Sequence, residues 1–599
     1  MMHYRLDVTL TLLGPILTRG GTTPEAGIDA PLARDGVGRP MLPFSLVKGK
    51  VRDAFHDLPH TSGFVEDWLG KGGNDEYFDQ RGRLRFSDFV TEEAGKTNDD
   101  LIERIEIDRA TGSTAGRMLA MVEAPFGYGQ PVPFQGTVEF IAGDDAVAAK
   151  VRDALDQAFR WVPTYGGLRT VGFGRTYCVQ TKLVTCPTRC RGTPTGASSL
   201  PLRLRLDRPL CLVGRRHSGN HFESLETISG AVLKGAAARL ILEMSGSPAK
   251  WLDPRARNSP WPFLWKHFEA IRFAEARPMT EGALHRPVEP PLSIVTSPTG
   301  LNQYFDVALE PEPRLIGGTA PAFAPDWKDE DFALVRGAFG WPTLPRERRT
   351  RTAIDARTGR AKDEALFSYG LVRPESKGDD GTIASYVWEA SIGLEDIDAN
   401  DRPAVIKELA DLLTYGLPGI GKTRATADVD WVSASTPPQQ PKVPLVGAEH
   451  VVTLQTEFLM TDPETLTGGI PADRLKRAYH DFWHEASNGA FALVRYFARQ
   501  ALYGGFLSRR SGQTRYEAFL ATERGSTFVL KALSPVEAAS ALQTWRERGL
   551  PAPEWVKRRY GNGTDPLWRT CPFLPHAGFG EVAIDLECHT KKRPPRLQP

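Results

Sequence analysis

The sequence predicts an α+β fold made of tandem ferredoxin-like (RRM-like) modules, each with the order βαββαβ and with long loop insertions. Two observations lead to this prediction. Three short motifs return in the same order along the chain, and the same succession of strand-like and helix-like segments surrounds each copy. Four strands and two helices per copy favour a sheet that can present one open face to RNA.

The repeated motifs share both residue types and spacing. The motifs and their second copies are residues 42–49 (LPFSLVKG) and 228–235 (ISGAVLKG), 107–112 (IDRATG) and 354–359 (IDARTG), and 164–176 and 414–423, which begin with TYG and contain a G-x-G loop. A third G-x-G loop stands at Gly578 and Gly580, again before a strand-like run. Three matches in one order indicate duplication of a whole module.

Each module is expected to open and close with a strand. Alternating apolar residues predict the opening strands, and apolar residues at helical spacing predict the second helix of a module. The expected opening strands are 4–13, 202–206 and 450–459, and the expected second helices are 146–161 and 404–414. Linkers rich in Pro, Ser and Thr divide the chain into modules at 1–190, 200–432 and 446–590, and residues 287–324 are expected to be surface loops.

Composition excludes several classes of protein. The 599 residues are 41% hydrophobic and 25% charged, as in ordinary globular domains. No apolar run has membrane-spanning length and the N-terminus is too polar for a signal peptide, so we expect a cytoplasmic protein without membrane contact. The six cysteines lack paired zinc-site spacing and are expected to be free thiols. A net charge of +1 counts against RNA binding through bulk charge but leaves room for a local basic groove.

A Gly/Pro-rich loop between the first strand and the first helix is the most informative stretch. It carries Asp29 and ends in the helix start LPFSLVKGK. The unpaired N–H groups of a helix N-terminus, with Ser45, Lys48 and Lys50 beside them, could hold an anion such as a phosphate. The alternative is a capped helix with solvated lysines.

One motif suggests a different activity. Residues 416–423 (GLPGIGKT) satisfy the P-loop pattern G-x-x-x-x-G-K-[ST]. A P-loop needs a strand before it and a helix after it, whereas here a helix precedes it and the strand-like run 424–432 follows. Pro418 would also remove one of the phosphate-binding amides. The module repeat explains the stretch better, because the same glycine loop returns at Gly172 and Gly578.

Cations gather at two of the repeated motifs. Beside the glycine loops stand Arg169, Arg175, Lys422 and Arg424. Along the expected hairpins that end in Thr-Gly turns stand Arg104, Arg109, Arg351 and Arg357. Both places suit contact with phosphates and splayed bases, with a structural turn and a salt-bridged edge hairpin as open alternatives. Asp108 and Asp355 are expected to cap the turns and not to be catalytic.

Asp29 is the strongest candidate for chemistry. A carboxylate beside a bound phosphodiester could position a divalent metal, or orient a 2′-hydroxyl for attack on the adjacent phosphate. The corresponding loop of the second module, 213–224, has no matching aspartate. Asp35 is the nearby competitor, and His217 and His221 could instead support acid–base cleavage of RNA.

Assembled in this order, the motifs resemble the RAMP superfamily of CRISPR effector subunits. Residues 27–52, 83–89, 107–112 and the glycine loop at Gly172 look like the type III backbone subunit. That subunit usually has Ile-Pro-Gly-Ser-Ser-Leu-Lys-Gly where this chain has LPFSLVKG, so the chain departs from it at Phe44 and at the second Ser and Leu. The resemblance implies that Asp29 cuts target RNA with a divalent metal.

Residues from about 200 onward look like the cap-type, two-module RAMP protein of type III-D systems. The segments that carry this likeness are 226–236, 351–355 with 365–367, 525–530, and 571–573 with 578–580. The resemblance implies that this part holds the 5′ handle of a guide RNA and is not a nuclease. A backbone-plus-cap fusion and two backbone units both remain open.

These observations lead to one expectation with two rivals. We expect a guide-RNA-binding subunit of a type III CRISPR ribonucleoprotein, an endoribonuclease that cuts complementary target RNA with Asp29 and Mg²⁺ or Mn²⁺. Its expected partners are guide RNA, target RNA and other effector subunits. The rivals are a non-catalytic guide-RNA scaffold and an endoribonuclease that processes precursor guide RNA. The residues expected to bind RNA are Ser45, Lys48, Lys50, Arg52, Arg104, Arg109, Arg169, Arg175, Lys234, Arg351, Arg357 and Lys422.

Overall fold

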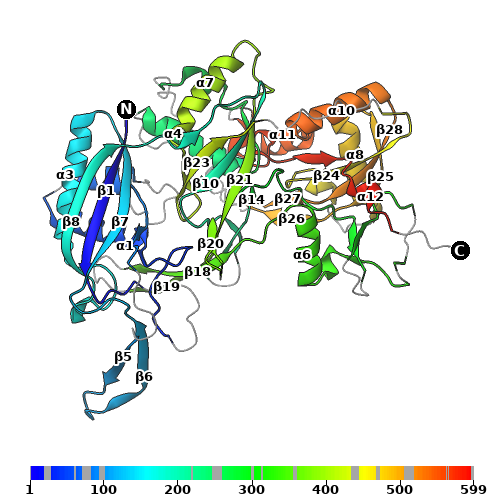
Figure 1. The fold of residues 1–599 in the computed structure, drawn as a ribbon. Coiled ribbons are helices and arrows are strands. Elements are labelled where there is room, and N and C mark those ends of the chain that lie inside the picture. Colours follow the sequence, from blue (N-terminus) through cyan, green and yellow to red (C-terminus); the bar gives the residue numbers. More distant parts are fainter. Residues whose placement is uncertain are drawn as a thin grey trace.

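Three mainly antiparallel sheets lie in a row from the N-terminal to the C-terminal end of the molecule (Figure 1). We name the first, second and third units after the sheets whose strands fall within residues 2–185, 190–431 and 449–584. The computed structural model describes residues 2–18, 28–59, 62–70, 82–93, 101–216, 220–245, 259–297, 303–311, 315–316, 318–354, 361–378, 380–433, 444–466, 472–504, 518–561, 563 and 566–594. The chain is a mixed α+β protein with several sheets, as the sequence predicts.

The first unit is a sheet of order β2-β4-β7-β1-β8, with β3 also paired to β7. Its elements are β1 (Met2–Leu13), β2 (Met41–Leu42), α1 (Phe44–Asp57), α2 (Ser62–Leu69), β3 (Arg85–Phe86), β4 (Phe89–Val90), β7 (Pro131–Ala142), α3 (Asp145–Trp161) and β8 (Arg175–Thr185). Strand β1 buries every second side chain from Tyr4 to Leu12 in the core that α1 and α3 cover. Helix α3 begins where the Asp144 carboxylate accepts a hydrogen bond from the Val147 N–H.

The second unit has the sheet order β13-β21-β10-β23-β22, with β14 and β20 also paired to β21 and β9 to β23. Its elements are β9 (Cys190–Arg191), β10 (Ser199–Leu206), α4 (Gly230–Met244), α5 (Pro262–His267), β13 (Arg272–Phe273), β14 (Arg277–Thr280), β20 (Glu375–Lys377), β21 (Ile383–Gly393), α7 (Arg402–Leu413), β22 (Leu417–Ile420) and β23 (Ala425–Trp431).

The third unit has the order β25-β28-β24-β29. Its elements are β24 (Glu449–Leu454), α8 (Ala472–Ala486), β25 (Phe491–Phe497), the separate hairpin β26 (Gln500–Tyr503) and β27 (Phe519–Thr522), β28 (Thr527–Ala532), α10 (Pro535–Arg548), α11 (Glu554–Tyr560) and β29 (Val582–Ile584). In all three units a central strand (β1, β10 or β24) lies between the last strand (β8, β23 or β29) and the strand that leads into α3, α7 or α10 (β7, β21 or β28). One connectivity is therefore used three times.

The glycine loops occupy the same place in each unit. Each lies directly before the strand that pairs with the central strand, and both glycines of each loop have positive φ: +90° and +62° at Gly172 and Gly174, +81° and +65° at Gly419 and Gly421, and +87° and +74° at Gly578 and Gly580. A Cβ atom at Gly174 would lie 2.0 Å from the Tyr165 carbonyl oxygen. Only glycine combines this close approach with a left-handed backbone.

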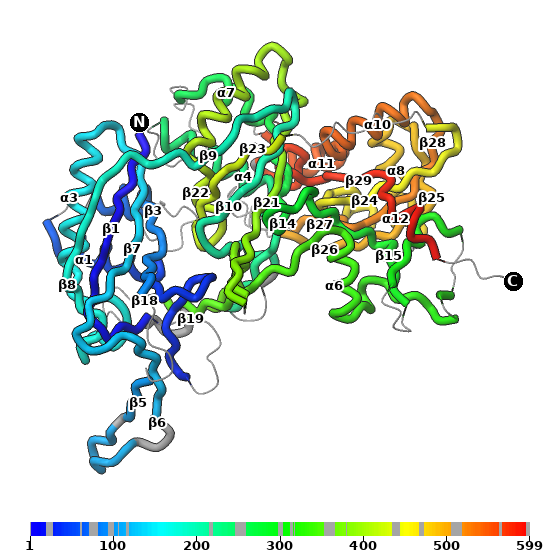
Figure 2. The backbone as a smooth tube through the Cα atoms, in the orientation of Figure 1, coloured from blue at the N-terminus to red at the C-terminus, as the bar shows by residue number. Residues whose placement is uncertain are grey.

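Two long hairpins extend from the first and second units. The first consists of β5 (Leu101–Ile107) and β6 (Thr114–Glu123), and it projects from the first unit (Figure 2). The second consists of β18 (Arg346–Ile354) and β19 (Ala361–Val372), which join β11 (Val213–Arg216) and β12 (His221–Ser224) in a separate sheet. This second hairpin reaches the first unit, because Arg373, just after β19, donates to the Gly36 carbonyl at 2.7 Å.

The insertion at 287–324 is more ordered than the sequence analysis expected. It was expected to form surface loops, but the described part contains a three-stranded sheet of β15 (Ile294–Thr296), β16 (Tyr304–Asp306) and β17 (Ala322–Phe323), followed by α6 (Asp329–Ala338). Its strands have only two or three residues each, so they are too short to produce a periodic pattern in the sequence.

Buried charges join the second and third units. Arg277, 1% exposed, donates to the Gln455 side chain at 2.8 Å and lies 3.3 Å from Glu275. Glu275 also pairs with Arg524 at 2.8 Å, and Arg524 in turn pairs with Glu457 at 2.8 Å. Each charge has a hydrogen-bonded partner of opposite sign, which a buried ionic group needs.

No helix in the described ranges is both long enough and apolar enough to cross a membrane.

Candidate nucleic-acid interface and acidic loop

Asp29 lies on the surface of the first unit, beside the root of the β5–β6 hairpin. Its side chain is exposed. Its N–H donates to the Met121 carbonyl at 2.9 Å, and its Oδ2 accepts from the Met121 N–H at 2.8 Å. The other oxygen, Oδ1, has no hydrogen-bond partner among the described residues. The loop therefore offers one carboxylate oxygen in a fixed direction.

Asp35, the competitor, has a structural environment. Its Oδ1 accepts from the N–H groups of Val37 and Arg39 at 3.1 and 2.8 Å, and its Oδ2 pairs with the Arg39 guanidinium at 2.7 Å. Both oxygens are therefore occupied in closing a turn. This leaves Asp29 as the carboxylate of the loop that can take a ligand.

The start of α1 is capped by the protein itself. The Phe44 N–H donates to Oδ1 of Asp88 at 2.7 Å, so a carboxylate already sits at the positive end of this helix. Ser45 is exposed in the first turn. The Asp88 carboxylate therefore occupies the position at which the sequence pattern suggested a bound anion.

A small cavity of about 50 Å³ lies where the first unit meets the second. We call it the cationic cavity, because its lining contains the basic residues Lys48, Arg85, Arg208, Arg239 and Arg424, together with Phe44, Gly82, Leu84, Phe86, Pro418 and Gly419. No acidic side chain is among these lining residues. The lining is therefore basic although the whole chain is almost neutral, and Arg208 pairs with Asp207 just outside it.

Lys48 differs from its neighbours in the cationic cavity. Arg85 and Arg239 both pair with Glu243 from outside the lining, whereas Lys48 has no carboxylate partner in the part of the chain that the structure describes. Burial, together with the nearby Arg424, lowers the pKa of Lys48 to about 7. An anion at this point would restore the full charge of the ammonium group.

An aromatic–cation cluster lies at the same junction; it consists of Phe44, Phe222, Tyr369, Arg351 and Lys422. The rings of Phe222 and Tyr369 stack with centroids 5.4 Å apart and planes at 15°. Lys422 lies 4.6 Å from the Phe222 ring centre, and Arg351 lies 5.4 Å from that of Phe44. Neither cation has an ion-pair partner among the described residues. Stacked rings beside unpaired cations are the features that bind single-stranded nucleic acid.

The remaining predicted cations of the first unit fall into two groups. Lys50 and Arg52 have partners within the unit: Lys50 lies 3.6 Å from Asp53, and Arg52 donates to the Leu69 and Gly70 carbonyls at 2.6 and 2.9 Å. The solvent-facing group contains Arg109 at the tip of the β5–β6 hairpin, the half-buried Arg104 within that hairpin, and the exposed Arg169 and Arg175 at the glycine loop. The structure does not bring this second group to the cationic cavity.

Lys234 lies in the interior, although it corresponds to Lys48 in the repeat. Its ammonium group donates to the carbonyls of Glu269 and Ile271 at 3.0 and 2.7 Å and lies 3.1 Å from Nδ1 of His576. The side chain is 9% exposed, and burial lowers its pKa to about 7. In this position Lys234 joins the second unit to the third and presents no charge at the surface.

Three of the predicted residues, His217, Asp355 and Arg357, lie outside the described residues. His221 lies 3.3 Å from Glu223. Residues 416–423 form β22 and the turn into β23, with α7 before them. The P-loop pattern therefore lacks the helix that would have to follow it, as predicted from the sequence.

No sequence pattern singled out Arg85, Arg208 and Arg239 of the cationic cavity, or the nearby Phe222. These residues come from four separate segments, and no spacing connects them. One sequence signal did point to the aromatic–cation cluster. Phe367 and Tyr369 are two residues apart in β19, so their rings lie on one face, and the neighbouring strand β18 is rich in arginine.

Comparison with known proteins gives a match for the first unit. Residues 9–177 match the model of the RAMP superfamily. This part of the chain is therefore similar to a RAMP superfamily domain, and the RAMP fold implies ferredoxin-like modules. None of the curated proteins that were compared matches the chain.

Two solved structures are similar to parts of the chain. One is a cryo-EM structure of the Type III-B Cmr-beta bound to cognate target RNA, with 16% identity and a TM-score of 0.21. The match covers 30% of this chain and 60% of the chain compared, so this protein spans less than two thirds of the length of that relative. The other is the Type III-B Cmr-beta bound to cognate target RNA and AMPPnP, state 1, with 12% identity, a TM-score of 0.30, and coverage of 62% and 93%.

Proposed function

We propose that this chain is a guide-RNA-binding subunit of a type III CRISPR ribonucleoprotein and that its first unit cuts target RNA at Asp29. The RAMP match of residues 9–177 supports the superfamily. The observation that carries the catalytic part is the exposed Asp29 carboxylate, which Met121 holds with one oxygen left for a ligand.

The junction of the first and second units is the proposed guide-RNA contact. Lys48, Arg351 and Lys422 lack carboxylate partners among the described residues, so their charges are available to phosphates. The stacked Phe222 and Tyr369 add ring faces to which unpaired bases can stack. Phosphate contacts would supply affinity, and the rings would hold bases that are not paired to target.

The Asp29 site fits a hard divalent cation. Mg²⁺ keeps several waters and binds through one or two carboxylates plus substrate phosphate oxygens, and Mn²⁺ accepts the same oxygen ligands, so a single exposed carboxylate is an adequate protein ligand. Asp29 would hold the ion, which would polarise the scissile phosphate when bound. The Met121 N–H fixes the carboxylate plane, and Asp35 takes no part because both its oxygens close a turn.

The three units are proposed to have different tasks. Residues 1–190 would be a backbone-type module with the cleavage loop, and 200–432 and 446–590 would be two cap-type ferredoxin-like modules. The threefold connectivity supports this division. The corresponding loop of the second unit, residues 213–224, contains no aspartate, and its described parts form β11 and β12.

An Asp29→Asn variant tests the catalytic proposal. In purified complex loaded with guide RNA, we expect target binding within about twofold of wild type and one target cut slowed by roughly 100-fold or more. Asp153→Asn, an exposed change on α3, is the matched control and should cut normally. An unchanged set of cleavage products in Asp29→Asn would favour the non-catalytic scaffold.

Metal dependence distinguishes the other rival function, processing of precursor guide RNA, from the proposed cleavage of target RNA. A precursor-processing enzyme that uses His221 would cut precursor guide RNA in EDTA and lose activity in His221→Ala. The proposed target nuclease should stop in EDTA and recover with Mg²⁺ or Mn²⁺, with His221→Ala unaffected.

A further inference from the structure

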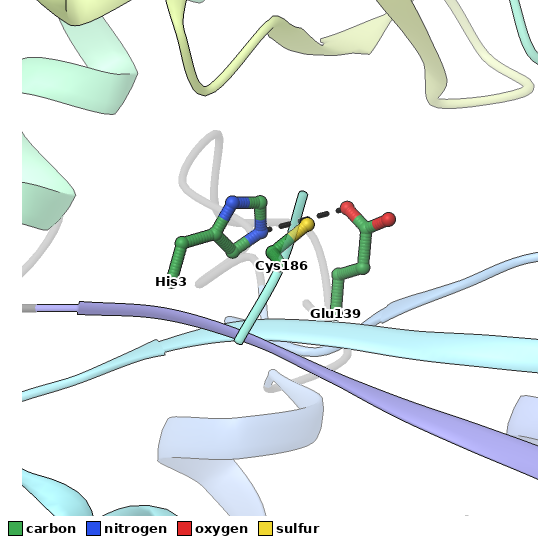
Figure 3. A group of neighbouring side chains, drawn as sticks. All are labelled: His3, Glu139 and Cys186. Carbon is green, nitrogen blue, oxygen red and sulfur yellow. Dashed lines mark ion pairs between the residues drawn. The ribbon is translucent and has the colours of Figure 1, made fainter. Parts of the chain in front are cut away.

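Three strands of the first unit bring a histidine, a glutamate and a cysteine together on one face of the sheet. His3 is on β1, Glu139 is on β7, and Cys186 directly follows β8. Strand β1 lies between the other two, so the three side chains come from neighbouring positions and point to the same side (Figure 3). Their Nε2 or Nδ1, carboxylate and Sγ atoms all lie within 4.8 Å of one another.

Hydrogen bonds within the protein do not satisfy all the polar atoms of this group. Nε2 of His3 is 3.5 Å from Oε2 of Glu139, longer than an ordinary hydrogen bond. His3 is only 5% exposed, and its Nε2 has no hydrogen-bond partner. Leaving a buried ring nitrogen without a partner costs free energy, so we expect a bound ion or ligand between His3 and Glu139.

The separation of His3 and Glu139 fits a tetrahedral metal ion. Zinc–nitrogen and zinc–oxygen bonds of roughly 2.1 Å place two ligands of a tetrahedral site about 3.4 Å apart. The observed 3.5 Å between His3 and Glu139 agrees with this value. A thiol and an imidazole together are typical zinc ligands, whereas Mg²⁺ and Ca²⁺ prefer oxygen.

The contacts around Glu139 and Cys186 are those expected of metal ligands. The other oxygen of Glu139 pairs with Arg189, which also pairs with Asp428 of the second unit at 2.5 Å. The Cys186 N–H donates to the His3 carbonyl at 2.9 Å, which fixes the strand that carries the thiol. Such outer contacts orient ligands in metal sites. Cys186 is only partly buried, so an ion can enter from its side.

We propose that His3, Glu139 and Cys186 bind one zinc ion, with water in the fourth position. On binding, the Cys186 thiol gives its proton to solvent and coordinates as thiolate. The ion ties the segment after β8 to β1 and β7, and so fixes the path by which the chain leaves the first unit for the second. This role is separate from RNA binding and from Asp29.

A second group, Asp306, Cys588 and His589, serves as a comparison. There Nδ1 of His589 is 3.1 Å from Asp306, an ordinary hydrogen-bond distance, and Asp306 also accepts from the Ser293 hydroxyl at 2.8 Å. The imidazole and the carboxylate of this group thus lie closer together than those of His3 and Glu139, although Nε2 of His589 is also buried without a hydrogen-bond partner.

Metal analysis of the full-length protein tests the proposal. Protein purified without chelator should contain about one zinc per chain. That content should fall below roughly one tenth of an equivalent in Cys186→Ser and stay unchanged in Cys190→Ser and Cys588→Ser, two matched controls. Cobalt(II) added to metal-free wild type should give a thiolate-to-cobalt absorption band that Cys186→Ser lacks.

Three results would overturn the proposal: wild-type protein that neither contains zinc nor gives the cobalt band, a Cys186→Ser protein that keeps both, or loss of zinc in Cys588→Ser alone. His3→Gln provides a second variant if Cys186→Ser does not fold, and it should also lose the metal. Added zinc should raise the melting temperature of metal-free wild type but not of His3→Gln.

Discussion

The Lys234 ammonium lies 3.1 Å from Nδ1 of His576, and this contact joins the first helix of the second unit to the glycine loop of the third. The same relationship occurs one unit earlier, where Lys48 of α1 and Arg424 after the second glycine loop line the cationic cavity. The two junctions differ in their partners. Lys234 donates to two backbone carbonyls, whereas Lys48 has neither a hydrogen-bond partner nor an ion-pair partner among the described residues. In both junctions a lysine of a first helix lies next to the glycine loop of a neighbouring unit, but Lys234 is bonded in the interior whereas Lys48 lines a cavity.

Acid should weaken the junction at His576. Burial and the nearby Lys234 lower the pKa of His576 to about 4, against 6.5 when unfolded. Between these values the unfolded chain binds more protons, so stability is lost as pH falls from 6.5 to 4, by roughly 3 kcal/mol at most. Urea unfolding at pH 7, 5.5 and 4.5 measures this. His576→Asn, whose amide oxygen can still accept from Lys234, should lose less stability over the same range.

RNA affinity should depend on pH through Lys48. Its pKa of about 7 means that the ammonium group is partly neutral in the free protein, and a bound phosphate would favour the charged form. Affinity for a single-stranded RNA should therefore fall as pH rises above 7, by at most about tenfold per pH unit. Fluorescence anisotropy at constant ionic strength measures the effect. In Lys48→Arg, which stays charged, the profile should be flatter; identical profiles would remove Lys48 from the RNA contact.

Loss of a ring from the aromatic–cation cluster should weaken RNA binding. Tyr369→Ala removes one of the two stacked rings, and stacking on an aromatic side chain is worth about 1–3 kcal/mol per base. The dissociation constant should rise by about 5- to 150-fold. Phe332→Ala, at a half-exposed ring on α6, is the control and should bind as wild type does. Equal affinities for the two variants would contradict a stacking role.

Two glycines of one loop should tolerate alanine differently. Both have positive φ, so alanine costs about 1–2 kcal/mol at either one. A Cβ at Gly421 would also lie 2.5 Å from the Cys211 carbonyl oxygen, whereas a Cβ at Gly419 meets nothing within 4 Å. Thermal unfolding should therefore show a larger loss for Gly421→Ala than for Gly419→Ala. The reverse order would mean that the loop relaxes away from Cys211.

Much of the fold was predictable because the chain repeats itself. The glycine loops at Gly172, Gly419 and Gly578 were located from sequence alone, and all three precede the strand beside the central one. Periodicity also predicted the helix at 146–161, observed as α3. The insertion at 287–324 was missed because its strands are too short to show a period.

The candidate site was less predictable, because its neighbours come from different units. Lys48 and Lys234 look equivalent in sequence, and only the three-dimensional structure shows that one lines a cavity and the other is buried beside His576. Asp88 caps α1 from 44 residues away, which no local pattern reveals. The residues of the proposed zinc site likewise come from distant positions, 3, 139 and 186.

Arg277, sealed between the second and third units, has a consequence for how the protein comes apart. Pulling these two units from each other would uncover Arg277, Glu275 and Arg524 together, and each would need to rebuild its hydration shell without its counter-charge. We therefore expect the C-terminal two thirds of the molecule to melt as a single cooperative block, with its two halves neither loosening nor refolding independently.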